Sequence, residues 1–84
     1  MVNPSTDIAE LVRTVVEPLV EHKDELDITS IMNENNEVLI EIRSHEEDAG
    51  KIIGRQGRVI KAIRTLARAA ASRVNTHVEV ELID

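Results

Sequence analysis

The sequence contains no cysteine, phenylalanine, tyrosine or tryptophan. Without cysteine the chain has no disulfide bonds and no thiol chemistry, which favours a reducing compartment. Without aromatic side chains it has no rings on which to stack bases, so any nucleic-acid binding must use backbone groups, cations and aliphatic contacts. The hydrophobic core must be aliphatic for the same reason.

Long apolar runs and a targeting pattern are also missing. No stretch reaches 18 consecutive apolar residues, and Asp7, Glu10 and Glu17 interrupt the first 20 residues. A length of 84 residues predicts one domain, residues 1–84, without a linker or repeat. We therefore expect a soluble, cytoplasmic protein that makes no membrane contact.

Charge is present but unevenly distributed. Sixteen acidic and ten basic residues give a net charge of -6. Between Ala49 and Val78, however, seven residues are basic and none is acidic, while the rest of the chain carries three basic residues against sixteen acidic ones. Binding responds to the local field more than to the net charge, so this pattern predicts one basic surface suited to an anionic partner.

The first half of the chain predicts a helix followed by a hairpin. Apolar residues at helical spacing predict a helix over residues 4–21, which Pro18 should kink or divide. Residues 28–32 and 38–42 have the β-branched composition of strands and are separated by a short polar turn. This arrangement predicts an antiparallel hairpin.

The second half predicts two helices and a last strand. Ser44 and Glu47 have the spacing of a capping box and would open a helix over residues 45–53. A longer helix is predicted over residues 58–74, and alternating residues 78–82 predict a strand. The fold class is therefore α+β, in the order α-β-β-α-α-β, with three helices on one face of a three-stranded sheet. The two-helix crossover makes the last two strands parallel, so the sheet should be mixed.

A glycine turn separates the two predicted later helices. Gly54 stands where a helix end commonly needs a left-handed residue, and Gly57 opens the next helix. The unpaired N–H groups at that helix start favour an anion such as phosphate, and Arg55 and Gln56 add a cation and a neutral hydrogen-bonding group. The alternative is a plain helix–turn–helix corner in which the glycines only make the bend.

A row of basic residues favours the anion-binding interpretation. On a helical wheel of residues 58–74 the basic side chains gather on one arc beside the apolar face. Charged helix surfaces normally mix both signs, whereas this one contains no acidic residue. The members of this basic row are Arg58, Lys61, Arg64 and Arg68.

Residues 52–63, IIGRQGRVIKAI, resemble the KH-domain signature I-I-G-x-x-G-x-x-I-x-x-I at every defined position. The predicted element order resembles the bacterial, type II form of this fold over the whole chain. The resemblance implies a protein that binds single-stranded RNA, with the turn at residues 54–57 gripping the sugar–phosphate backbone and about four nucleotides in an adjacent groove. The RNA-binding core would be about residues 37–83.

The resemblance also implies which residues contact RNA. Strand 38–42 would form the far wall of the groove, which is why Arg43 is included, and Ile53 and Ile60 would belong mostly to the core. The implied contacts are Gly54, Arg55, Gln56 and Gly57 in the turn, Lys51, Arg58 and Lys61 beside it, Ile52 and Val59 as aliphatic contacts, and Arg64, Arg68 and Arg43 further away.

Catalytic and metal chemistry find no support in the residue pattern. His22, His45 and His77 lie in separate connectors, without cysteine and without ligand-type spacing. No adjacent base is arranged for nucleophilic work beside Ser44, Thr65, Ser72 or Thr76. The spacing of a nucleotide-hydrolase phosphate loop is absent. We therefore expect no enzymatic activity, no metal site, no cofactor and no small-molecule substrate.

Two functions from different classes remain open. One is single-stranded RNA binding; the other is an interaction module that uses the KH fold for dimerisation. The alanine-rich part of the last helix can pack either against another chain or against the protein's own sheet. The resemblance implies a homodimer, a larger Jag-type KH protein as a possible partner, and a post-transcriptional or RNA-chaperone role linked to cell shape and cell-wall biogenesis.

Overall fold

The computed structural model describes residues 4–83 and confirms the predicted order of elements. Short 3-10 turns, labelled η, separate several of the longer elements. The elements are α1 (Pro4–Val16), η1 (Glu17–Leu19), η2 (Lys23–Glu25), β1 (Asp27–Met32), β2 (Glu37–Arg43), α2 (Glu46–Ile53), η3 (Arg55–Gly57), α3 (Arg58–Ser72) and β3 (His77–Ile83).

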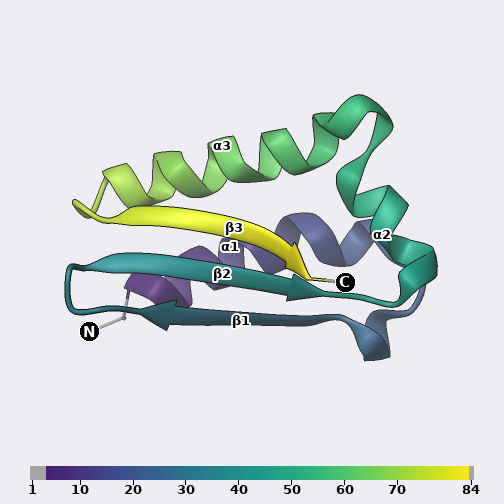
Figure 1. The fold of residues 1–84 in the computed structure, drawn as a ribbon, viewed down its shortest axis with the longest axis horizontal. Helices are drawn as coiled ribbons and strands as arrows, with labels where there is room; N and C mark the ends of the chain where they lie inside the picture. The colour runs from purple at the N-terminus through teal and green to yellow at the C-terminus, as the bar shows by residue number, and fades with distance from the viewer. Residues whose placement is uncertain (1–3, 84) are drawn as a thin grey trace.

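The sheet is mixed, as predicted. Its order is β1-β2-β3, with β2 in the centre. β1 pairs antiparallel with β2, and β2 pairs parallel with β3, so that Val38 lies beside both Met32 and Val78. Figure 1 shows α1 behind the strands and α3 running alongside β3, which leaves the front of the sheet without a helix. The fold is the α+β arrangement of a type II KH domain.

The core lies between the sheet and the helices and is entirely aliphatic. Alternate residues of each strand point towards the helices because side chains in a strand alternate between faces. Each fully buried Val, Leu or Ile contributes about 1.5–3 kcal/mol relative to exposure. The buried core comprises Ile8, Val12, Val16, Val20, Leu26, Ile28, Val38, Ile40, Ile42, Ile52, Ile60, Ile63, Ala67, Ala71, Val78 and Val80.

Pro18 ends the first helix earlier than residue 21. α1 stops at Val16, and Pro18 lies in the separate turn η1. Proline has no N–H for the helical ladder and its ring crowds the preceding turn, so the last predicted turn is divided off. None of the described helices is long and apolar enough to cross a membrane.

The start of α2 differs from the prediction. His45, not Ser44, is the N-cap, and its Nδ1 accepts the backbone N–H of Glu47 at 3.0 Å. The Ser44 hydroxyl instead donates to the carbonyl oxygen of His45. The capping box was therefore wrong, because the helix begins one residue later and an imidazole nitrogen serves as the acceptor.

Candidate nucleic-acid interface

The turn between α2 and α3 is built by residues with positive φ. Gly54 has φ 77° and ψ 172°, and Gly57 has φ 74° and ψ 15°. The first pair of angles is open essentially only to glycine, and the second is left-handed. The Gly54 N–H donates to the carbonyl of Gly50 at 2.8 Å, and the Gly57 N–H donates to the carbonyl of Gly54 at 3.1 Å. Hydrogen bonds therefore hold the backbone of the turn.

Gln56 at the tip of the turn is also left-handed, with φ 59° and ψ 24°. The other non-glycine residues with positive φ in residues 4–83 are Asn36 and Asn75, and asparagine adopts this region more readily than glutamine does. Holding glutamine there costs about 1–2 kcal/mol. Backbone strain of this kind gathers at functional sites, which favours a role for the tip.

The positive end of α3 faces the turn. The N-cap is Gly57, and no side chain within residues 4–83 caps this helix start. The helix dipole and the first-turn N–H groups therefore attract an anion approaching the turn. Arg55 and Arg58 are both exposed beside it, and the Arg58 guanidinium donates from Nη2 to Oε1 of Gln56 at 3.2 Å.

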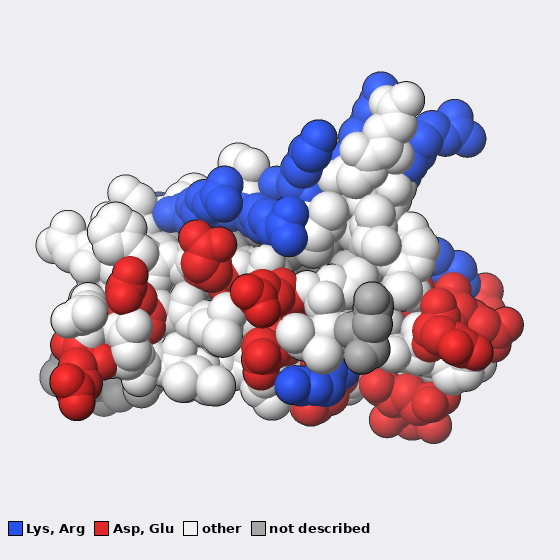
Figure 2. Space-filling view, in the orientation of Figure 1, with Lys and Arg blue, Asp and Glu red and all other residues white. Residues whose placement is uncertain are grey.

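The basic row extends from the turn along α3. Figure 2 shows blue side chains over the turn and along the helix, while red side chains lie across the sheet and at the opposite end of α2. Lys61 and Arg68 are exposed, but Arg64 is half-buried, and its Nε donates to the carbonyl oxygen of Val80 at 3.1 Å. Arg64 therefore braces α3 against the edge strand β3.

Lys51 and Arg43 are held by carboxylates. Lys51 Nζ lies 3.0 Å from Glu21 Oε1 and 3.4 Å from Asp48 Oδ1. The hydrogen bond to Glu21 raises the pKa of Lys51 above its ordinary value, and Asp48 adds to this effect against the cost of burial. Arg43 lies at the end of β2, 3.4 Å from Glu41 Oε1. Both cations are thus engaged by carboxylates, and their contacts with RNA stay predictions.

The aliphatic residues around the turn divide differently from the expectation. Ile52 is fully buried and Ile53 is 40% exposed, while Ile60 is buried and Val59 is half-buried. Ile52 follows the buried Asp48 by four residues on the inner face of α2, and one further residue turns Ile53 by about 100° towards solvent. The side chain of Ile52 therefore belongs to the core, and Ile53 is an exposed apolar neighbour of the turn that sequence reasoning missed.

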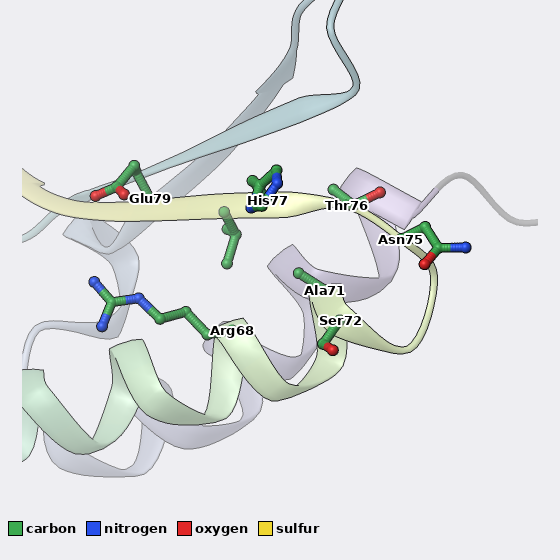
Figure 3. Close-up of a pocket in the computed structure, with 8 residues that line it drawn as sticks. Arg68, Ala71, Ser72, Asn75, Thr76, His77 and Glu79 are labelled. Carbon is green, nitrogen blue, oxygen red and sulfur yellow. The ribbon is translucent and has the colours of Figure 1, made fainter.

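A groove lies between α3 and the edge strand β3, towards the end of α3 that is far from the turn, and β2 is the central strand of the sheet. The far wall predicted at residues 38–42 does not line this groove and stays a prediction. The groove has a volume of about 530 Å³. Figure 3 shows the side chains of both elements that line it. Apart from Arg68, no sequence signal marked its residues, because their proximity depends on how α3 crosses the sheet. The lining residues are Arg68, Ala71, Ser72, Asn75, Thr76, His77, Val78 and Glu79.

A buried carboxylate fixes α2, the helix that leads into the turn. Asp48 is fully buried, and its two oxygens accept the backbone N–H groups of Glu21 at 3.1 Å and His22 at 2.9 Å. Burial alone would raise the pKa of Asp48, but these hydrogen bonds, together with Lys51, outweigh it and hold the pKa below its ordinary value of 3.8. Asp48 therefore ties the connector after η1 to α2 as an anion.

The fold and the turn together define a KH domain of type II. The family described as KhpA/KhpB, KH domain, matches residues 9–82. The chain belongs to this family.

Similar proteins cover nearly the whole chain. RNA-binding protein KhpA of Borreliella burgdorferi is 43% identical over 75 residues, which are 89% of this chain and 90% of that protein. RNA-binding protein KhpA of Caldanaerobacter subterraneus subsp. tengcongensis is 41% identical over 76 residues, covering 90% of this chain and all of that protein.

Solved structures of Era share the fold. Era of Aquifex aeolicus bound to GDP and aluminium fluoride superimposes with a TM-score of 0.63 and 19% identity, over 99% of this chain and 33% of Era. A complex of Era with MgGDPNP and a 16S ribosomal RNA fragment gives a TM-score of 0.64 and 23% identity, over 96% of this chain and 30% of Era. At this level of identity the likeness concerns the fold alone.

Proposed function

We propose that this protein is a non-catalytic, cytoplasmic protein that binds single-stranded RNA by clamping its sugar–phosphate backbone with the GRQG turn. The observation that carries the proposal is the uncapped, glycine-lined start of α3 beside a row of cations without an acidic residue. The relatives named RNA-binding protein KhpA support it. We expect the binding core at about residues 37–83 and a post-transcriptional or RNA-chaperone role.

The residues of the turn and those beside it have different roles in the proposed binding. Gly54 and Gly57 shape the backbone so that a phosphate can approach the α3 N–H groups, and Arg55 and Gln56 supply side-chain contacts. Arg58 and Lys61 extend the positive field along the helix. Without aromatic stacking, affinity should be low and sequence preference slight.

Aliphatic contacts and the groove complete the proposed site. Val59 is the half-buried apolar contact, and exposed Ile53 joins it in place of the buried Ile52. Arg68 is proposed as the cation of the groove between α3 and β3.

The test is the double variant Arg55→Asp/Gln56→Asp, with a gel-shift assay on single-stranded RNA at low salt. Both positions are exposed, so circular dichroism should show an unchanged fold while RNA retention is lost. The matched control is Arg13→Asp/Thr14→Asp on α1, which makes the same change in net charge outside the turn and should retain RNA. Unchanged retention by the turn variant would refute the backbone clamp.

A second proposed function is self-association through α3. Leu66 on α3 and Val74 in the turn that follows this helix are 46% and 47% exposed, whereas Ala67 and Ala71 pack into the protein's own core. Exposed apolar side chains on a helix favour contact with another chain, either a second copy or a larger Jag-type KH protein. Solution mass tests the homodimer, which Leu66→Glu should dissociate; a monomeric wild-type protein would contradict it.

A further inference from the structure

Two histidines that are far apart in the sequence lie together in the structure. The rings of His22 and His45 stack with centroids 3.9 Å apart and planes inclined by 19°. His22 and His45 come from separate connectors, as expected, but the fold brings their rings together, while His77 lies elsewhere, at the start of β3. Sequence spacing could not show the pair, because one histidine follows α1 and the other precedes α2.

Main-chain hydrogen bonds hold the pair in place. The buried carboxylate of Asp48 accepts the N–H of His22 itself at 2.9 Å, which fixes the connector against α2. His45 is fixed as the N-cap of the same helix through its Nδ1. The two rings are therefore positioned by the fold and do not meet merely as mobile surface side chains.

Each ring presents one nitrogen to Glu47 and the other to Glu25. Oε1 of Glu47 lies 3.3 Å from Nε2 of His22 and 3.6 Å from Nδ1 of His45. Oε2 of Glu25 lies 3.9 Å from Nδ1 of His22 and 3.8 Å from Nε2 of His45. Glu25 thus faces one nitrogen of each ring at a distance longer than a hydrogen bond, and Glu47 faces the other nitrogen of each ring.

The helix cap gives independent evidence that Nδ1 of His45 is an acceptor. This nitrogen accepts the N–H of Glu47, so it carries no proton, and the ring proton must lie on Nε2, the nitrogen that faces Glu25. A carboxylate behind the far nitrogen of each imidazole is the arrangement that orients histidine ligands in metal sites.

The distances from Glu47 to the two inner nitrogens fit a tetrahedral ion. With metal–ligand bonds of about 2.0–2.1 Å, two ligands of tetrahedral zinc lie about 3.3–3.4 Å apart. The distances from Glu47 to the two histidines, 3.3 and 3.6 Å, are close to this value, and the ligand atoms of all three residues lie within 4.8 Å of one another. An imidazole coordinates in its own plane, and the two planes are inclined by only 19°, so at least one ring must rotate about its side-chain bonds before both lone pairs meet at one ion. Neither ring is buried, which leaves room for this rotation.

We propose that His22, His45 and Glu47 form a surface site for a divalent transition-metal ion such as Zn²⁺, with Glu25 as the outer carboxylate that orients both imidazoles. Two nitrogens and one carboxylate oxygen suit Zn²⁺, and water completes the tetrahedron. The ion replaces the N–H of Glu47 at Nδ1 of His45, exchanging one cap hydrogen bond for a coordinate bond. It then links the connector after η1 to the start of α2.

The test is calorimetric titration of the full chain with ZnCl₂, together with thermal melts in Zn²⁺ and in EDTA. Zn²⁺ should bind one site per chain and raise the melting temperature, because it binds the folded arrangement. His22→Gln should weaken binding by at least about 10-fold, and Glu25→Gln by about 10–100-fold, as for other outer carboxylates. His77→Gln, the matched control, should bind as the wild type does.

His45→Asn guards against loss of the helix cap, since asparagine is itself a good N-cap but removes the imidazole. This variant should keep its circular dichroism spectrum and lose Zn²⁺ binding. Equal Zn²⁺ affinity in wild type, His22→Gln and His45→Asn would overturn the proposal, as would loss of binding in His77→Gln. Ring ¹⁵N resonances of His22 and His45 that do not respond to Zn²⁺ would also overturn it. No arm of the test uses RNA, so its outcome is independent of the proposed RNA clamp.

Discussion

A Cβ atom placed on Gly54 would lie 2.8 Å from Cβ of Val59 and 2.9 Å from its backbone nitrogen. Real Cβ atoms essentially never approach other atoms so closely, and neither Val59 atom is the flexible end of a side chain. Val59 is the second residue of α3, so the start of this helix lies directly against the end of α2. Gly54 is therefore required both for its backbone angles and for its lack of a side chain.

Gly54→Ala should destabilise the fold more than Gly57→Ala does. At Gly57 an added Cβ would meet nothing closer than 3.9 Å, so only the left-handed backbone penalty of about 1–2 kcal/mol applies. Gly54→Ala adds the collision with Val59 to a comparable backbone penalty. Urea denaturation of both variants measures the difference.

Gly50→Ala is the control for these two variants. Gly50 lies inside α2, its φ is not positive, and a Cβ there would meet nothing within 4 Å. The free energy of unfolding should rise by about 0.5–1 kcal/mol, because alanine is the better helix former. Equal losses for Gly54→Ala and Gly57→Ala would contradict the proposed role of Val59.

Gln56→Asn should relieve backbone strain at the tip of the turn. Asparagine adopts the left-handed region several-fold more readily than most residues, so the free energy of unfolding should rise by up to about 1 kcal/mol. Chemical denaturation measures the gain. Arg55→Asn is the matched control, because Arg55 has no positive φ and asparagine should bring no gain there. If both variants gain equally, the left-handed backbone of Gln56 is not the source.

Much of the fold could be predicted from the sequence because local patterns determine it. The alternation in β3 and the apolar spacing of α1 gave these elements to within a few residues, and Pro18 marked the end of the first helix. Ser44 does not cap α2 because Nδ1 of His45 accepts the backbone N–H of Glu47 in its place. Histidine is not among the preferred N-cap residues, so the sequence did not indicate this cap.

The site could be predicted only in part. The glycine turn follows from local backbone requirements, which the sequence displays directly. Which of Ile52 and Ile53 is buried depends on the rotation of α2 about its axis. The ion pair of Lys51 with Glu21 depends on the path of the chain after η1. Contacts between segments distant in the sequence leave no such pattern, and the same holds for the His22–His45 pair.

Asp48→Asn should destabilise the protein in a pH-dependent way. The carboxamide has one acceptor oxygen for two backbone N–H groups, and its NH₂ group would face the other donor. Because the folded-state pKa of Asp48 is lowered, its stabilising contribution is complete above the ordinary value of 3.8 and is lost as pH falls through the folded-state pKa. Wild type and variant should therefore differ most near neutral pH and converge in acid.

Thermal melts of both proteins on either side of pH 3.8 measure this convergence. Asp24→Asn, which alters an exposed carboxylate, is the control and should follow the wild type closely at neutral pH. A constant difference in melting temperature between wild type and Asp48→Asn at every pH would show that Asp48 does not act as an anion.

Glu21→Gln should increase RNA affinity while changing stability little. Glu21 holds Lys51 Nζ at 3.0 Å, and its removal leaves only the longer contact with Asp48, so Lys51 becomes available beside the turn. Exposed ion pairs contribute about 0–1 kcal/mol, so the fold should tolerate the change. Gel shifts against Glu10→Gln, which makes the same charge change on α1, separate local release from net charge. Equal gains in both variants would exclude a specific role for Lys51.

The salt dependence of RNA affinity should report how many cations of the protein contact phosphates. If Arg55, Arg58, Lys61 and Arg68 each neutralise one phosphate, the logarithm of the affinity should fall against the logarithm of salt concentration with a slope of about -3, since each contact on a single strand contributes about -0.7. Arg58→Gln should therefore make the slope shallower by about 0.7. Arg13→Gln removes an equal charge on α1, outside the proposed site, and should leave the slope unchanged. A slope that responds to both variants alike would mean that RNA senses only the overall charge, and a flat response in the wild type would favour the interaction-module function over phosphate binding.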